Sequence, residues 1–144
     1  MVNTMIVSRY TGSPPLGETA SRTIPGGPLY PVGEVLELLE KEGAQIIAWT
    51  NKCQRDIQKW ELDLDDLCQL IELAVSSGRF RGSEWCVQHS NGPWAACDAY
   101  SLVRREWIKY ARKEVTTEYY IKFAIAKTGE LLILASCHPP EDRR

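Results

Sequence analysis

Residues 118–126 read EYYIKFAIA, residues 127–130 read KTGE and residues 131–138 read LLILASCH. The outer two segments are rich in aromatic and β-branched residues, and a short segment with a glycine separates them, which predicts an antiparallel β-hairpin. The last segment is apolar almost throughout, so we expect a central strand covered on both faces. Pro139 cannot donate to a strand ladder, so His138 should stand at the end of this strand.

Three side chains of this hairpin are suited to acid–base chemistry. Tyr120 and Lys122 are two residues apart, so their side chains should share a face of the first strand. Tyr120 and His138 lie at about equal distances from a turn centred on Thr128 and Gly129, so they should pair across the hairpin. A histidine titrates near neutral pH, which suits a general acid or base. The sequence therefore predicts His138, Tyr120 and Lys122 as catalytic candidates, with ordinary structural roles as the alternative.

The composition is that of one folded domain. The chain has 144 residues, of which 44% are hydrophobic and 25% are charged, so it can bury a core of ordinary size. No apolar run approaches the roughly 20 residues that span a bilayer, and the N-terminus lacks the pattern of a secretory signal. We therefore expect a cytoplasmic protein without a membrane partner.

The cysteines and histidines form no familiar metal or disulfide pattern. The five cysteines are irregularly spaced, without a CxxC pair, and the chain has two histidines. Structural zinc sites and disulfide frameworks use regular spacings, so we expect reduced cysteines, no metal site and no cofactor. Cys137 is adjacent to His138, but neighbouring strand residues point to opposite faces, so the two should not act together.

Charge is divided unevenly along the chain, although the net charge is only −2. Residues 1–78 carry six Lys or Arg against eleven Asp or Glu, a net of −5, whereas residues 79–124 carry eight against five, a net of +3. This division favours one positive face that binds an anion. The alternative is that the charges only hydrate the surface.

The first 30 residues predict an extended arm, because they are rich in proline and glycine and show no periodicity. We place a single domain over residues 31–144. Its first helix should open at Pro31, place Val35 and Leu39 on its buried face and be capped by Gly43. A second helix should start at Thr50 or Asn51 and a third at Asp63 or Asp65, ending before Gly78.

The second half of the chain predicts strands. Residues 79–89 and 94–100 are strand-like segments with a turn between them. Residues 101–114 have apolar side chains at helical spacing, so we expect a basic helical insertion there. Helices followed by strands indicate an α+β domain, with N-terminal helices packed on a mainly antiparallel sheet that ends in the hairpin.

From about Pro31 onward the chain resembles the MqsR family of bacterial toxins, which share the RelE/ParE-type ribonuclease fold. The resemblance rests on residues 62–68 (LDLDDLC), on residues 98–100 (DAY) and on the hairpin region 115–138. It implies a RelE/ParE-like sheet, a metal-independent mRNA endonuclease that acts through the 2′-hydroxyl, and a cognate antitoxin encoded nearby. A module that keeps the fold but only binds RNA or protein is the alternative.

The resemblance also implies roles for single residues. Tyr120 matches the family's strand tyrosine, and His138 stands where the best-known member has a lysine. Cys97 stands where that member has a catalytic glutamine, and Arg81 is the cation nearest to the position of a further family lysine. RNA cleavage needs an acid, a base and cations around the phosphate.

RNA binding needs a further set of side chains. Arg81, Arg104 and Arg105 are candidate phosphate ligands. Trp94 and Tyr100 are candidate stacking platforms for unpaired bases, with core packing as the alternative.

Overall fold

The computed structural model describes residues 5–15, 21–41, 45–108 and 112–138. Its helices are α1 (Val32–Glu40), α2 (Asn51–Lys59) and α3 (Leu64–Ser77). Its strands are β1 (Thr23–Ile24), β2 (Ile46–Ala48), β3 (Arg79–Val87), β4 (Trp94–Ile108), β5 (Lys113–Ile125) and β6 (Leu131–His138). The fold is therefore α+β, as predicted. Among the described residues, none of the helices is both long and apolar enough to cross a membrane.

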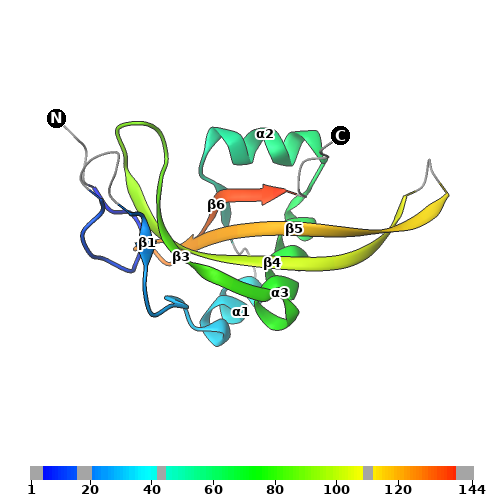
Figure 1. The fold of residues 1–144 in the computed structure, drawn as a ribbon, viewed down its shortest axis with the longest axis horizontal. Coiled ribbons are helices and arrows are strands. Elements are labelled where there is room, and N and C mark those ends of the chain that lie inside the picture. The colour runs from blue at the N-terminus through cyan, green and yellow to red at the C-terminus, as the bar shows by residue number, and fades with distance from the viewer. Residues whose placement is uncertain (1–4, 16–20, 42–44, 109–111, 139–144) are drawn as a thin grey trace.

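One six-stranded sheet, in the order β1-β3-β4-β5-β6-β2, organises the fold. All neighbouring strands are antiparallel except β2, which runs parallel to β6. In Figure 1, α2 lies beside β6, whereas α1 and α3 lie together near β4. The predicted hairpin is confirmed as β5 and β6, which are joined by a turn in which Gly129 has a φ of 92°. A positive φ is readily adopted by glycine, which explains the KTGE sequence of the turn.

The helix starts agree with the predicted caps. Thr50 accepts a hydrogen bond from the Cys53 amide at 3.1 Å, and Asp63 and Asp66 form a reciprocal capping box. The first helix starts directly after Pro31 and ends at Glu40. Gly43, its predicted cap, lies outside the described residues.

The prediction of a helical insertion over residues 101–114 is wrong. Residues 101–108 continue β4, and β5 starts at Lys113, so the two strands form a long ribbon paired from Asp98–Phe123 to Ile108–Lys113. This ribbon extends past the helices in Figure 1. The apolar side chains that fit a helical spacing also fit alternation along a strand, and Val115, Thr116 and Thr117 on the partner strand favour sheet. Cross-strand pairing therefore overrides the weak helical periodicity.

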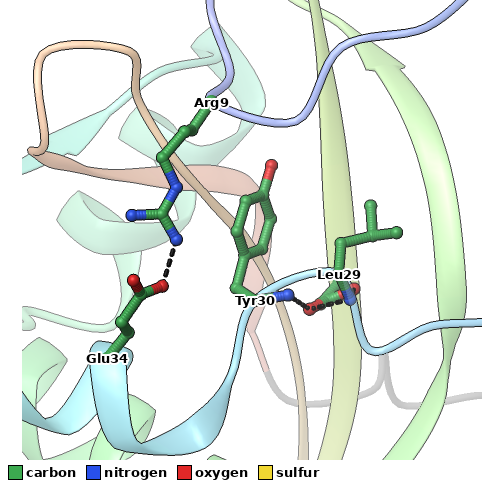
Figure 2. Close-up of polar contacts among 5 residues, drawn as sticks. Arg9, Leu29, Tyr30 and Glu34 are labelled. Atoms are coloured by element: carbon green, nitrogen blue, oxygen red, sulfur yellow. Dashed lines mark hydrogen bonds and ion pairs between the residues drawn. The ribbon is translucent and has the colours of Figure 1, made fainter.

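The N-terminal arm joins the sheet. The Trp94 amide donates to the Met5 carbonyl at 2.8 Å, and the Arg9 amide donates to the Ile125 carbonyl at 2.7 Å. The Arg9 side chain forms an ion pair with Glu34 at the start of α1 (Figure 2). The backbone amides of Leu29 and Tyr30 donate hydrogen bonds to the Asp98 carboxylate. Tyr30 is fully buried in the main core, so this part of the arm packs inside the fold.

Asp98 fixes the end of the arm to the middle of the sheet. Its fully buried carboxylate accepts hydrogen bonds from the amides of Leu29 and Tyr30 at 3.0 Å and from the Ser83 hydroxyl at 2.6 Å. The Tyr30 hydroxyl also donates to the Ala96 carbonyl at 2.6 Å. A buried carboxylate is tolerated when hydrogen bonds replace its hydration, and these bonds do so for Asp98.

Candidate functional site

The backbone register brings two predicted catalytic positions together. Tyr120 on β5 pairs with His138 on β6 and with Ser101 on β4. The predicted cross-hairpin pairing of Tyr120 and His138 is therefore confirmed at the level of the backbone. Tyr120 is half-buried, whereas the side chain of His138 lies outside what the structure describes. The catalytic roles of the two residues stay predictions.

Lys122, the third predicted catalytic residue, is occupied by an ion pair. Its ammonium lies 2.5 Å from the Glu84 carboxylate of β3, and both side chains are half-buried. Burial alone would lower the pKa of Lys122, but the hydrogen bond to Glu84 and neighbouring charges outweigh it and raise the pKa. Lys122 is therefore a permanent cation on the sheet, and its partner Glu84 partly neutralises it.

The register also defines which residues share a sheet face with Tyr120 and Lys122. Cross-strand partners lie on one face, and so do residues two apart. Lys122 pairs with Ala99 and Tyr120 pairs with Ser101, so both lie on the face of β4 that also carries Cys97. Glu84 of β3 pairs with Cys97 and therefore shares this face. We call the in-phase set Glu84, Cys86, Cys97, Ala99, Ser101, Tyr120 and Lys122 the catalytic-candidate face.

An open pocket of about 340 Å³ lies beside this face. Glu84, Cys86 and Lys122 line it from the sheet, and Arg22, Asn51 and Lys52 line it from the arm and from the start of α2. Three of these six side chains are cations and one is an anion. The pocket therefore favours an anionic or polar ligand over an apolar one.

The long ribbon extends the same face outward. Val103, Arg105 and Trp107 alternate in phase with Ser101 along β4, and all three are exposed, Trp107 by 63%. The Arg105 guanidinium lies 3.0 Å from Glu114 in a surface ion pair. Arg105 is thus exposed but already paired with Glu114, and its contact with RNA stays a prediction. The exposed Trp107 lies two residues beyond it.

The other predicted cations differ in their surroundings. Arg104 is on the opposite face, where its Nε donates to Glu106 at 2.7 Å and its guanidinium stacks over the Tyr119 ring. Arg81 is exposed beside a β-bulge between Phe80 and Gly82. Arg81 can therefore still meet a phosphate, whereas Arg104 is already bound within the protein.

Trp94 and Tyr100, the predicted stacking platforms, are both buried. Trp94 is 7% exposed and Tyr100 is 4% exposed. The Tyr100 ring stacks on Phe123 at 5.9 Å between centroids, and burial, together with the charge of Asp98, raises its pKa to about 12. Neither ring offers a free face to a base, so we correct the prediction and assign both residues to the core.

Sequence reasoning missed two members of the catalytic-candidate face, Glu84 and Cys86. Both alternate along β3, which suggests a shared face, but nothing in the sequence says which residues they meet. Their approach to Lys122 and Cys97 depends on a register set partly by the bulge at Gly82, where φ is 128°. The glycine was visible in the sequence, and an isolated glycine within a strand is a signal for such a bulge.

Comparison with known proteins identifies no relative. No protein-family model, no curated protein and no solved structure matches this chain at a significant level.

Proposed function

We propose that this chain is an RNA endonuclease of the toxin type, related to the MqsR and RelE toxins and acting on mRNA. The observation that carries the proposal is the register that pairs Tyr120 with His138 and places Lys122 in phase with Tyr120. A histidine, a tyrosine and a lysine at one place on a sheet supply the groups that RNA cleavage needs. The resemblance in the hairpin region supports the same choice.

Each residue has a distinct role in this proposal. His138 moves a proton between the 2′-hydroxyl or 5′-oxygen and solvent, because histidine titrates near neutral pH. Tyr120 donates its hydroxyl to a phosphate oxygen as negative charge develops there. Lys122 contributes positive charge, and exposed Arg81 and Arg105 bind phosphates further along the RNA. No step needs a metal ion.

A non-catalytic binding module is the second candidate function, and one contact favours it. Lys122 is held by Glu84 at 2.5 Å, so its charge is less available to a phosphate than that of an unpaired lysine. In addition, buried Cys97 stands where the best-known MqsR toxin has a catalytic glutamine. Under this second proposal, the chain binds RNA or a protein partner without cleaving RNA.

Expression in a bacterial host separates the two functions. We expect the wild-type chain, expressed alone, to arrest growth and to produce cut ends in mapped mRNA, and His138→Ala to do neither. His89→Ala is the matched control and should behave as wild type, since His89 is exposed in the connection between β3 and β4. Growth arrest without cut RNA would favour the binding module. Full cleavage by a folded His138→Ala protein, together with loss of cleavage in His89→Ala, would move the assignment to Arg81 and His89.

The proposed toxin also implies an antitoxin. A neighbouring gene product should neutralise the chain and copurify with it as a stable complex when both are expressed from the native operon. Recovery of the chain alone, in a harmless form, from that operon would count against a toxin–antitoxin pair.

A further inference from the structure

We propose that Cys86 and Cys97 form an oxidisable thiol pair, in which a small hydroperoxide oxidises Cys86 and Cys97 then closes a disulfide with it. The two cysteines belong to the catalytic-candidate face, but the proposal does not rest on RNA cleavage. The two cysteines lie on neighbouring antiparallel strands, where Cys86 pairs with Ala95 and Cys97 pairs with Glu84. They are therefore diagonal neighbours on one face of the sheet.

The two thiols lie on the same face of the neighbouring strands β3 and β4. The Cys97 thiol donates a hydrogen bond to the Ala95 carbonyl oxygen at 3.7 Å. Hydrogen bonding with Cys97 lowers the pKa of the Cys86 thiol, opposed by burial and assisted by the Lys122 charge. The pKa of the Cys97 thiol is raised by its interaction with Cys86 and by full burial. Cys86 is therefore the more acidic thiol of the two.

Access is also divided between the two cysteines. Cys86 lines the open pocket that it shares with Lys122, Glu84 and Lys52. Cys97 is 2% exposed and does not line that pocket. A small oxidant that enters the pocket meets Cys86 first. Reactive cysteines combine a lowered pKa with an electropositive setting that an oxidant can reach. Cys86 is 6% exposed, but it lines a pocket with Lys122 and Lys52, and its pKa is lowered.

The chemistry requires two balanced steps. The Cys86 thiolate attacks one oxygen of the hydroperoxide, an S–O bond forms while the O–O bond breaks, and the released oxygen leaves as water or an alcohol. Sulfur loses two electrons and becomes a sulfenic acid. The Cys97 sulfur then attacks the Cys86 sulfur, an S–S bond forms, the S–O bond breaks, and water leaves with the Cys97 proton. The hydroperoxide is the only oxidant consumed.

The sheet limits how stable the product is. Diagonal neighbours have Cα atoms about 7–8 Å apart, whereas disulfides usually span about 4.4–6.8 Å between Cα atoms. Closing the bond therefore needs a small approach of β3 and β4. A disulfide formed in this way is easily reduced, which suits a reversible modification.

Cys68 provides an internal control. It lies on α3 and is more exposed than Cys86. Its partial burial and the nearby carboxylates of Asp65 and Glu72 raise the pKa of its thiol. Simple accessibility therefore predicts that Cys68 is oxidised before Cys86, whereas our proposal predicts the reverse order.

The experiment treats the reduced full-length chain with hydrogen peroxide, blocks remaining thiols with N-ethylmaleimide and maps tryptic peptides by mass. Trypsin cuts after Arg81 and Arg104, so both cysteines stay in one peptide. We expect the disulfide form of this peptide, which is two hydrogens lighter and carries no N-ethylmaleimide, to accumulate at least about tenfold faster than Cys68 is oxidised. Dithiothreitol should restore both thiols.

Two variants complete the test. Cys97→Ser should stop disulfide formation and leave a Cys86 sulfenic acid that dimedone traps, whereas Cys68→Ser should change nothing in the 82–104 peptide. Faster oxidation of Cys68 in the wild-type chain, or a 82–104 peptide that stays blocked at both cysteines, would overturn the proposal. These wild-type readouts decide the question even if a cysteine variant fails to fold.

Discussion

The Lys122 ammonium reaches across β4 to the Glu84 carboxylate of β3 and lies 2.5 Å from it. This contact joins three strands and also decides how much charge the proposed RNA site can offer. The same ion pair therefore contributes to stability and limits binding. Substitution of Glu84 separates the two effects.

Glu84→Gln should bind single-stranded RNA more tightly than wild type, because it releases Lys122 for a phosphate. Each added phosphate contact steepens the dependence of log affinity on log salt by about 0.7 for single strands. Fluorescence anisotropy at several salt concentrations measures both changes. Lys122→Gln is the matched control and should weaken binding. Equal affinity and salt slope for wild type and Glu84→Gln would show that Lys122 does not contact RNA.

The stability of Glu84→Gln should depend on pH in a defined direction. Lys122 has a folded-state pKa raised above its ordinary value of 10.5, so its contribution is complete below that value and is lost as pH rises through the raised pKa. Since both side chains are partly exposed, we expect a loss of about 1 kcal/mol or less at neutral pH. Urea unfolding at neutral pH and above pH 10.5 should show the difference shrinking. A difference that grows with pH would contradict this account.

Tyr120→Phe should reduce RNA turnover by about 10²-fold, because loss of one donor to a charged transition state costs about that much. RNA affinity should change little, since only a hydroxyl is removed. Tyr119→Phe is the matched control: Tyr119 lies on the opposite face and donates its hydroxyl to Glu106 at 2.5 Å. Cys137→Ser should also leave turnover near wild type. Equal turnover losses in Tyr119→Phe and Tyr120→Phe would remove Tyr120 from the catalytic set.

Asp98→Ala should destabilise the fold by about 3–5 kcal/mol, because it leaves buried donors without their charged acceptor. These donors are the amides of Leu29 and Tyr30 and the hydroxyl of Ser83. Asp56→Ala, which removes a surface ion pair with Lys52, should cost less than about 1 kcal/mol. Urea unfolding compares the two variants. A loss for Asp98→Ala no larger than that for Asp56→Ala would mean that the arm is not anchored here.

The sequence predicted those features whose cause is local. Thr50 and Asp63 cap helices through neighbouring residues, and the KTGE turn sets the pairing of the residues next to it, up to Phe123 with Ile133. These features need only turn and capping chemistry. The pairing of Tyr120 with His138 also depends on a register shift between Lys122 and Phe123, which the sequence did not predict. The burial of Trp94 and Tyr100 and the contact of Lys122 with Glu84 depend on strand order and on packing from the other side of the sheet. Local pattern holds no information on these contacts.

The error over residues 101–114 has the same origin. Val103 and Trp107 are four residues apart, a spacing that places them on one face of a helix and also on one face of a strand. The choice between them is made by the partner strand, which begins at Lys113. The corrected assignment replaces the basic helical insertion with a ribbon of β4 and β5 that extends past the helices (Figure 1). Arg105 and Trp107 belong to its β4 strand.

That ribbon gives the last prediction, which concerns the path of the RNA. If RNA follows the catalytic-candidate face outward, a base should stack on exposed Trp107, and Trp107→Ala should cost about 1–3 kcal/mol of binding free energy. Trp60 is the matched control, because it is also exposed but lies at the end of α2. Both tryptophans line a wide pocket of about 860 Å³ between the helices and the ribbon. Binding of a short RNA to each variant, measured at one fixed salt concentration, compares them.

The outcome distinguishes two paths. Weakening by Trp107→Ala alone supports a path along the face that leads back to Tyr120, because Trp107, Arg105 and Ser101 are in phase on β4 and Ser101 pairs with Tyr120. Equal weakening by Trp107→Ala and Trp60→Ala would place the RNA in the pocket, on the side of the ribbon where Arg104 is already paired with Glu106. In that case the RNA does not follow the catalytic-candidate face, and Tyr120 and Lys122 lose their proposed contact with it.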